Sequence, residues 1–418
     1  MLLLDGEPFS VPIDVVIIGA GPYGLSVAAH LRASDVSCRI FGKPLATWRD
    51  HMPAGMMLKS DGFASNLSDP RREGTLEAYC RAHGVPYGAT DHAISLALFN
   101  EYALDFQRRF VPELEELDVV ALDRDTEGFS IRLENGEILQ ARQVVVAVGI
   151  AHFAHMPPEL AGLPRHLVSH SADHHDVSSF AGREICVIGG GSSAVDLATL
   201  LAEAGTRVQL IARSHQVRFA NPAGVGRRSL WKRIRHPSSG IGPGLRSRLF
   251  EVFPGLFRFL PGPLRLFIIK RHLGPKAAWG MKARFEAGVD ALVGGSVVTA
   301  AADGARARLG VRDCDGTMRE VLADQVIAAT GYAVYVERIK LIDPGLRGNV
   351  RTHRGMPLLS GNFESSVPGL YFVGPAAVNS FGPLMRFMVG AKYVAPRIAQ
   401  VLAKRGTVSL SPVEVATA

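Results

Sequence analysis

The stretch Ile13-Asp-Val-Val-Ile-Ile-Gly-Ala-Gly-Pro-Tyr-Gly24 decides the fold of this chain. Its first six residues form a short, β-branched apolar run, which is typical of a buried parallel strand. Gly19, Gly21 and Gly24 then have the spacing of a tight turn, and residues 25–33 have the composition of a helix. A strand, turn and helix in this order place backbone amides at the helix N-terminus, where they can bind the pyrophosphate of a dinucleotide.

A second copy of this pattern occurs in the middle of the chain. Glu184–Ile188 reads as a strand, Gly189-Gly-Gly-Ser-Ser-Ala194 as the turn, and residues 195–205 as the helix. One glycine motif alone is a weak signal, because glycine-rich turns occur in many proteins. Two copies, each between a strand and a helix, predict two dinucleotide-binding units.

The second strand of each unit ends where the adenosine ribose is recognised. In the first unit this strand is followed by Gly42-Lys43, where an acidic residue is usual. In the second unit, Arg213-Ser214 stands at that place, and Arg218 follows nearby. An arginine there suits the 2′-phosphate of NADPH, with a solvated basic residue as the alternative.

Three further segments read as strands that complete the sheets: residues 144–149, 324–332 and 369–375. We expect Pro383 to be the first residue of a long helix, since its missing N–H costs nothing at that position. The positive end of that helix, with Arg386 in its first turn, would suit the anionic pyrimidine edge of a reduced flavin. An ordinary C-terminal helix is the alternative.

The chain is too long for one core, since 418 residues predict two or three domains. Its four cysteines include no C-x-x-C pair, which argues against a zinc site and a redox-active disulfide and favours a reducing, intracellular setting. Residues 1–10 lack the features of a secretory leader, and no apolar run reaches about 18 residues. We therefore expect a cytoplasmic protein, and a peripheral membrane contact stays open.

Residues 169–176 are rich in histidine and aspartate, which raises the question of a metal site. Solvated or turn-capping side chains are the plainer interpretation, and we expect no metal.

A basic segment interrupts the second unit. Between Arg213 and Lys276 there are fourteen Lys and Arg residues against one acidic residue, although the net charge of the whole chain is only +7. Apolar residues recur there at helical spacing: Leu249, Phe250, Phe253, Leu256, Phe257 and Leu260. Three prolines should break the segment into short helices: Pro254, Pro261 and Pro263. A lid over the active site, an interfacial membrane contact and a solvated or oligomer-facing surface all stay open. Nucleic-acid binding is disfavoured, because no zinc finger, helix-turn-helix or RNP pattern accompanies the charge.

Taken together, these motifs resemble the flavin-containing monooxygenase superfamily, and most of all its N-hydroxylating branch of lysine and ornithine hydroxylases. The matching pieces are Gly19–Gly24, Gly189–Ala194 (similar to GGGQSA), Asp324–Tyr332 (similar to D-x3-(L/F)ATGY), and Trp48 with His51, Met52 and Met56. Three positions depart from the family. Only His170-Ser171 fits the F-x-G-x3-H signature, Ser192 replaces the glutamine of GGGQSA, and Asp61 falls where an asparagine near the flavin is expected.

The resemblance implies an enzyme in which NADPH reduces FAD, and O2 then forms a flavin C4a-(hydro)peroxide that transfers one oxygen to a small-molecule substrate. N-hydroxylation is favoured, with S-oxidation and Baeyer-Villiger insertion as the other reactions of this class. The implied FAD contacts are Gly19, Gly21, Pro22, Tyr23, Gly24, Lys43, Trp48, His51, Gly149, Gly331, Gly374, Pro375 and Arg386. The implied NADPH contacts are Gly189, Gly191, Ser192, Ser193, Ala194, Arg213, Ser214 and Arg218, and the catalytic candidates are Lys59 and Asp61. The alternatives are a membrane-peripheral NAD(P)H:quinone-type dehydrogenase and a flavin-binding redox sensor.

The predicted fold is α/β, with two Rossmann-like, doubly wound, three-layer domains and the NADPH domain inserted in the FAD domain. We expect the FAD domain over residues 1–160 and 321–405, the NADPH domain over 162–320 with its basic amphipathic insertion at 213–276, and a tail at 406–418. Residues 58–116 should be largely helical, and Asn135-Gly136 should turn a hairpin. The substrate and the oligomeric state stay open.

Overall fold

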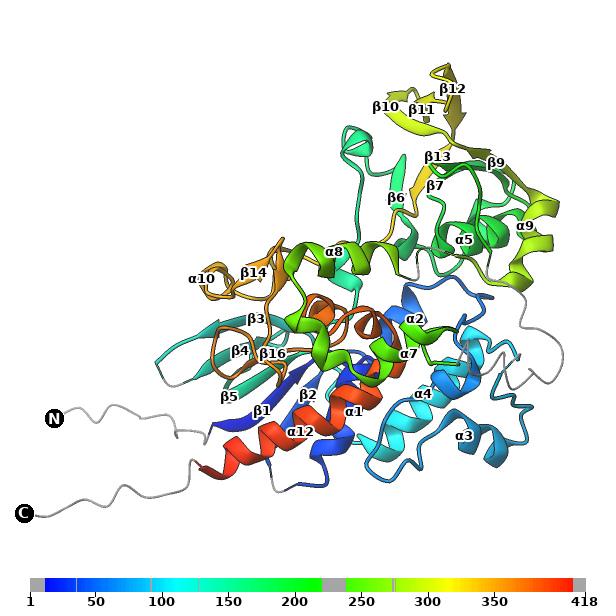
Figure 1. Cartoon of the computed structure of the whole chain (residues 1–418). Helices are drawn as coiled ribbons and strands as arrows, with labels where there is room; N and C mark the ends of the chain where they lie inside the picture. Colours follow the sequence, from blue (N-terminus) through cyan, green and yellow to red (C-terminus); the bar gives the residue numbers. More distant parts are fainter. Residues whose placement is uncertain are drawn as a thin grey trace, which may run out of the picture.

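A computed structural model of the chain describes residues 12–34, 36–90, 92–126, 128–219, 238–272, 274 and 276–408 (Figure 1). The described residues form two α/β units, each built on its own sheet. The predicted fold class is therefore confirmed.

The first unit contains a six-stranded sheet in the order β2-β1-β5-β4-β3, with β16 also pairing with β5. β1, β2, β5 and β16 run parallel, and β3, β4 and β5 form an antiparallel meander. The bounds are β1 Ile13–Ile18, β2 Cys38–Phe41, β3 Val119–Arg124, β4 Phe129–Leu133, β5 Ile138–Val146 and β16 Leu370–Phe372. The predicted hairpin at Asn135-Gly136 is confirmed, since it joins β4 to β5.

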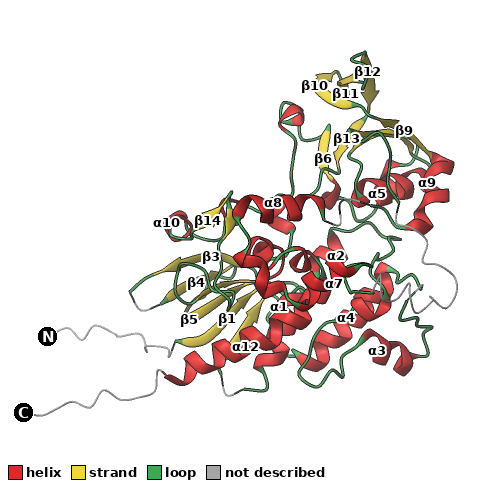
Figure 2. Cartoon of the chain, viewed as in Figure 1, coloured by secondary structure: helices red, strands yellow, loops and turns green. Residues whose placement is uncertain are grey.

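Helices pack against this sheet because their apolar faces need cover (Figure 2). α1 (Pro22–Leu31) follows the first glycine turn and packs against the C-terminal helix α12 (Ala391–Val408). α2 (Ala46–Asp50), α3 (Leu76–His83) and α4 (Leu96–Phe110) come from the segment after β2, and Thr75 and Ser95 cap α3 and α4 through their side chains. The expectation of largely helical structure over residues 58–116 is confirmed for α3 and α4, whereas residues 58–74 contain only a short 3-10 turn, η1 (Gly62–Ala64).

The second unit contains a parallel sheet in the order β6-β13-β7-β8-β9. Helices α5 and α9 belong to this unit, and a three-stranded antiparallel sheet, β10-β11-β12, lies between β9 and β13 in the chain. The bounds are β6 Val168–His170, β7 Glu184–Ile188, α5 Ser192–Glu203, β8 Arg207–Ala212, α9 Lys282–Gly288, β9 Val289–Val293, β10 Ser296–Asp303, β11 Arg306–Arg312, β12 Met318–Ala323 and β13 Gln325–Ala328.

The expected return to the first unit at residue 321 is wrong. β13 pairs in parallel with both β6 and β7 and therefore lies inside the second sheet. Val326, Ile327 and Ala328 are fully buried there, because a central strand needs apolar side chains on both faces. The chain leaves the second unit only after Ala328.

The insertion forms short helical pieces separated by proline, as predicted. They are α7 (Leu245–Val252), the 3-10 helix η6 (Pro254–Phe259) and α8 (Gly262–Arg271). Residues 220–237 of the basic segment lie outside the described residues. Although the insertion interrupts the second unit in sequence, it packs on the first: Ile241 belongs to the first unit's core, and η6 contacts α11 (Val378–Phe381).

The expected long helix from Pro383 is also wrong. The chain after β16 forms η9 (Gly374–Ala377), α11, η10 (Pro383–Arg386) and η11 (Met388–Gly390), and α12 begins only at Ala391. The buried Tyr23 hydroxyl donates to the carbonyl oxygen of Phe387 at 2.7 Å. Phe387 has extended backbone angles, so a continuous helix is interrupted there. Three small elements complete the first unit: α10 (Pro344–Gly348), β14 (Thr352–His353) and β15 (Met356–Pro357).

Within the described part of the chain, no helix is both long and apolar enough to cross a bilayer. No group of three or more metal-ligating side chains is found among those residues either. The histidine-rich segment caps a turn as predicted: the His170 ring accepts from the Ala172 amide, and Asp173 accepts from the His170 amide.

Candidate functional site

The first glycine turn has the shape that a dinucleotide needs. Gly24 can only be glycine, because a Cβ there would lie 1.9 Å from the carbonyl oxygen of Gly19. A Cβ on Gly21 would meet no atom within 4 Å, so the backbone is open on that side. Gly21 is the N-cap of α1 and supplies no side chain to the first amides of the helix. Pro22 has no N–H, so the amides of the next residues, Tyr23 and Gly24, are those available to a phosphate, which fits the pyrophosphate of FAD.

The missing acidic residue after β2 has a structural reason. Gly42 has φ +125°, a conformation that side chains rarely adopt, and a Cβ there would lie 3.4 Å from the amide nitrogen of Ala20. Lys43 beside it is exposed. This backbone conformation disfavours any side chain, a carboxylate included, so a ribose here would have to be held by other groups.

The second glycine turn repeats this arrangement. The Gly189 amide donates to the carbonyl oxygen of Ile211, so the turn lies at the ends of β7 and β8. Gly191 is the N-cap of α5 and again supplies no capping side chain. Of the predicted phosphate contacts, the Ser192 hydroxyl donates to the carboxylate of Asp196 at 3.3 Å. The amides at this helix N-terminus fit a second pyrophosphate.

The predicted 2′-phosphate contacts lie at the end of β8. Arg213 and Arg218 are both exposed, and the Ser214 hydroxyl donates to the carbonyl oxygen of Gln216 at 3.0 Å. Among the described residues, no carboxylate forms an ion pair with Arg213. The guanidinium groups are therefore accessible to a phosphate.

Residues 51–59 join the two units. His51 donates to the carbonyl oxygen of Ala172 at 2.9 Å, and the Ala54 amide donates to the carbonyl oxygen of His175 at 2.8 Å. His175 in turn donates to the carbonyl oxygen of Met52 at 2.6 Å. We call residues 51–59 the strap, because they tie the first unit to the segment between β6 and β7 of the second unit.

The strap ends in an ion pair that the sequence pattern does not predict. Lys59 Nζ lies 3.5 Å from Oδ2 of Asp196, one turn inside α5. Asp196 is only 3% exposed, and burial raises its pKa while the Lys59 charge opposes that rise. The one sequence feature that pointed to Asp196 is its spacing: it lies four residues after Ser192, one helical turn away, and its carboxylate accepts from the Ser192 hydroxyl. The catalytic candidate Lys59 thus lies at the junction of the units, whereas Asp61 is the N-cap of η1 and its carbonyl accepts from the Ser65 hydroxyl.

A cavity of about 80 Å³ also lies between the units. Its lining includes Thr47 and His51, Ile150 after β5, Asp173, and Tyr332 after β13. Two predicted flavin contacts meet here, because His51 lines the cavity and a Cβ on Gly149 would lie 4.0 Å from the Thr47 hydroxyl.

Other predicted flavin contacts are engaged by the protein itself. Trp48 packs on Phe99, with ring centroids 4.6 Å apart. The Tyr23 ring would lie 3.2 Å from a Cβ on Gly374, which precedes Pro375 at the end of β16. The carbonyl oxygen of Gly331 accepts from the His155 amide at 2.9 Å.

Arg386 does not have the predicted environment. It donates to the carbonyl oxygens of Ile269 at 3.3 Å and His272 at 2.8 Å, at the end of α8. Arg386 is exposed, and both of its bonds to carbonyl oxygens are charge-assisted. Arg386 therefore anchors the insertion, and the helix N-terminus expected beside the flavin is absent from this described segment.

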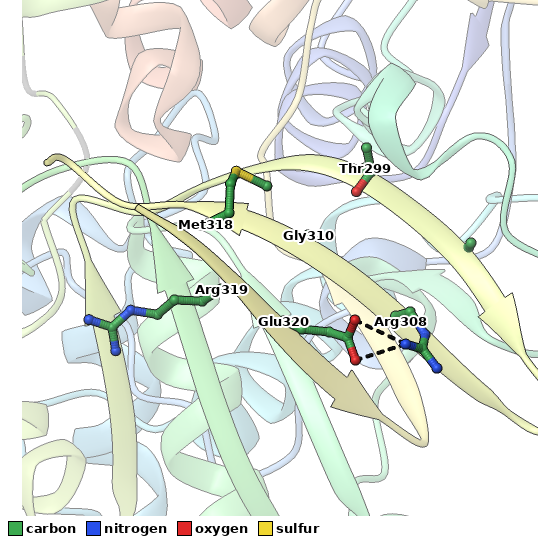
Figure 3. A pocket seen from close by; sticks show the side chains of 7 residues that line it. Thr299, Arg308, Gly310, Met318, Arg319 and Glu320 are labelled. Carbon is green, nitrogen blue, oxygen red and sulfur yellow. Dashed lines mark hydrogen bonds and ion pairs between the residues drawn. The ribbon is translucent and has the colours of Figure 1, made fainter. Parts of the chain in front are cut away.

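A larger hollow, of about 270 Å³, lies on the β10-β11-β12 sheet and is lined by residues such as Thr299, Met318 and Arg319 (Figure 3). Its Arg308 is paired with Glu320 at 2.9 Å and with Asp303 at 2.6 Å. Its second arginine, Arg319, is paired with Asp313. Because both arginines are already paired with carboxylates and neither glycine turn lines the hollow, it is not the candidate site.

The parallel sheets, the two glycine turns and the strap between them define a two-dinucleotide-binding oxidoreductase. The chain belongs to the pyridine nucleotide-disulphide oxidoreductase family, whose profile matches residues 13–227.

The proteins that this chain resembles include both oxygenases and reductases. Indole-3-pyruvate monooxygenase YUCCA1 of Oryza sativa subsp. japonica is 27% identical over 344 residues, covering 76% of each chain. The ornithine hydroxylase of Pseudomonas aeruginosa superposes with a TM-score of 0.75 at 16% identity, over 94% of this chain and 99% of that one. A bacillithiol disulfide reductase of Staphylococcus aureus superposes with a TM-score of 0.64 at 16% identity, over 94% of this chain and 99% of that one. The resemblance to flavin-dependent monooxygenases is confirmed, and the structural likenesses establish the fold.

Proposed function

We propose that the protein is an FAD-dependent monooxygenase that uses NADPH and O2 to add one oxygen atom to a small-molecule substrate. N-hydroxylation is the favoured reaction. The balance is substrate, O2, NADPH and a proton giving oxygenated substrate, water and NADP⁺. Sequence similarity to an indole-3-pyruvate monooxygenase over 76% of both chains, together with the fold of an ornithine hydroxylase, supports this choice.

The observation that carries the proposal is that the strap joins the first unit to the helix that starts at the second glycine turn. Lys59, from the first unit, pairs with Asp196 on the helix that starts at the second turn. A hydride donor and a flavin must meet at such a junction, because hydride transfer needs direct contact between the two rings. Bound FAD would supply the oxygen chemistry and NADPH the reducing equivalents.

The chain's own residues bind and orient these groups. The amides of α1 after Gly21 would hold the FAD pyrophosphate, and those of α5 after Gly191 the NADPH pyrophosphate. Arg213 and Arg218 would recognise the 2′-phosphate. Lys59 neutralises the buried Asp196 and keeps α5 against the strap; for Asp61 we retain a role near the flavin as a proposal.

The test measures turnover with NADPH under isotopically labelled O2. Amines are screened first as substrates, and sulfides and ketones follow. Label in the product supports the proposal and identifies the acceptor atom. Quinone reduction that is insensitive to O2 would favour a quinone-type dehydrogenase instead, and negligible turnover with both acceptors would favour a redox sensor.

The proposed location is the cytoplasm, with peripheral contact to a membrane through the insertion at 213–276. All four cysteines are free thiols, which suits a reducing compartment. The described part of the insertion exposes apolar side chains, which supports a surface contact.

A further inference from the structure

The insertion carries an unusual concentration of exposed apolar side chains. Fourteen large hydrophobic residues are exposed in the described chain, and eight of them lie between Leu245 and Phe267. Phe259 is 70% exposed, and Leu245 and Leu256 are each 61% exposed. The full set is Leu245, Leu249, Val252, Phe253, Leu256, Phe259, Leu264 and Phe267. Single exposed apolar residues need no explanation, but a cluster on one segment marks an interaction surface.

Helix α7 has its apolar side turned toward solvent. Leu245, Leu249 and Val252 recur at helical spacing and are all exposed. Ser247, on the opposite side, is only 3% exposed, and its hydroxyl lies 3.4 Å from Nε2 of His272 on the inner side of the insertion. The apolar stripe is therefore not the face that α7 uses to pack on the protein.

The insertion is nevertheless held in place. Phe257 is almost fully buried and lies against Gly382, whose added Cβ would come within 2.9 Å of the ring. Arg265 donates to the carbonyl oxygen of Asn379 at 3.1 Å, and Arg386 fixes the end of α8. Figure 1 shows α7 and α8 as green helices lying over the first unit. The exposed stripe thus belongs to an anchored element.

The charges around the stripe point to an anionic partner. Residues 245–271 contain six basic residues and one acidic residue, Glu251. Arg246, Arg248, Lys270 and Arg271 are exposed. The Arg258 and Arg271 guanidinium groups lie 4.6 Å and 5.1 Å from the exposed rings of Phe259 and Phe267. An interfacial membrane contact requires aromatic and aliphatic side chains surrounded by cations. The apolar groups enter the boundary of the acyl chains, and the cations bind the lipid phosphates.

We propose that α7, η6 and α8 form a docking surface for an anionic lipid bilayer. Leu249, Phe253, Phe259 and Phe267 enter the headgroup region, and Arg246, Lys270 and Arg271 bind anionic headgroups. This inference specifies the lipid and the residues of the proposed peripheral contact, and it does not require that the enzyme be an oxygenase.

The experiment is flotation of the full chain with vesicles of phosphatidylcholine alone and of equal parts phosphatidylcholine and phosphatidylglycerol. The triple variant Leu249→Glu, Phe253→Glu, Phe259→Glu should bind the anionic vesicles more than about tenfold more weakly than the parent chain, because each change removes apolar contact and adds repulsion. The matched control is Ile138→Glu with Met318→Glu, which alters exposed apolar residues outside the insertion and should leave binding unchanged.

A second variant tests the charge. Arg246→Gln, Lys270→Gln, Arg271→Gln should weaken binding to anionic vesicles by about tenfold or more, and salt should weaken the parent in the same way. Thermal unfolding of each variant verifies folding.

Three results would overturn the proposal: no vesicle binding by the parent chain, equal binding to both vesicle types without salt dependence, or self-association that the glutamate triple variant abolishes while vesicle binding is absent. The last would identify a second copy of the chain as the occupant. NADPH oxidation in solution is measured separately, so failure of docking and failure of the oxygenase proposal are distinguishable.

Discussion

Asp196 is an acidic residue in a buried environment. It is a buried carboxyl on the first turns of α5, with Lys59 at 3.5 Å and the Ser192 hydroxyl at 3.3 Å. A buried charge is tolerated when a partner and hydrogen bonds compensate for lost water. Lys59 is itself 37% exposed, so solvent screens part of the attraction. The pair should matter more for α5 and its nucleotide than for overall stability.

We expect Lys59→Met to lower the free energy of unfolding by about 1–2 kcal/mol, since it leaves Asp196 without its cation. It should also weaken NADP⁺ binding, because an uncompensated carboxylate near the N-terminus of α5 opposes an anion there. The double variant Lys59→Met, Asp196→Asn should restore most of both losses. Chemical denaturation and calorimetric NADP⁺ titration measure them, and a double variant as weak as the single one would contradict this role.

The same pair predicts a pH dependence. A carboxyl whose pKa is higher in the folded than in the unfolded state takes up a proton on folding, so the free energy of unfolding falls as pH rises from the unfolded pKa toward the folded one. Burial raises the pKa of Asp196 and Lys59 opposes the rise, so removing Lys59 should enlarge this fall between acidic and neutral pH. Denaturation at several pH values tests it, with Asp196→Asn as the control in which this component should vanish.

Arg213 tests recognition of the nucleotide. Replacing Arg213 by Ala should raise KM for NADPH about tenfold or more while changing KM for NADH by no more than about twofold, since only NADPH carries the 2′-phosphate. Arg351→Ala, an exposed arginine on the first unit, is the matched control. Equal effects on both nucleotides would remove the 2′-phosphate role.

At the scale of elements, the insertion and the segment after β16 depend on each other. The sequence predicted Arg386 as a flavin contact, but its guanidinium binds two carbonyl oxygens at the end of α8. The periodicity of the sequence cannot predict such charge-assisted bonds between elements, because the partners are more than a hundred residues apart in the chain. The structure therefore assigns Arg386 to holding an element in place.

We expect Arg386→Ala to raise amide hydrogen exchange in residues 262–272 while FAD affinity changes by less than about threefold, because losing the two bonds costs about 1–3 kcal/mol locally. Exchange mass spectrometry and flavin fluorescence measure the two quantities. Arg397→Ala on α12, whose guanidinium donates to the carbonyl oxygen of Tyr393 in the same helix, is the control. A large loss of FAD affinity with unchanged amide hydrogen exchange would instead support the original prediction that Arg386 contacts the flavin.

At the scale of the whole molecule, the two units have separate hydrophobic cores. The first core includes α1, α12 and the first sheet, and the second unit's apolar residues fall into two further clusters around β7, β13 and β11. The strap joins the units mainly through hydrogen bonds and one ion pair. Units with separate cores can unfold separately.

Calorimetry should accordingly resolve two unfolding transitions. FAD should raise the midpoint of one and NADP⁺ the midpoint of the other, because each ligand stabilises the unit that binds it. The Lys59→Met variant should separate the transitions further. A single transition that both ligands raise equally would show that the strap couples the units into one cooperative body.

The sequence by itself determined the two nucleotide units, their order, and the proline breaks in the insertion. These features depend on neighbouring residues: a β-branched run before a glycine turn, and a ring that cannot continue a helix. Only the tertiary structure decided that β13 completes the second sheet, that Arg386 anchors α8, that Lys59 meets Asp196, and that the apolar stripe of α7 faces solvent. Each of these depends on which distant segments come together, and the burial and pairing of side chains that follow cannot be read from local spacing.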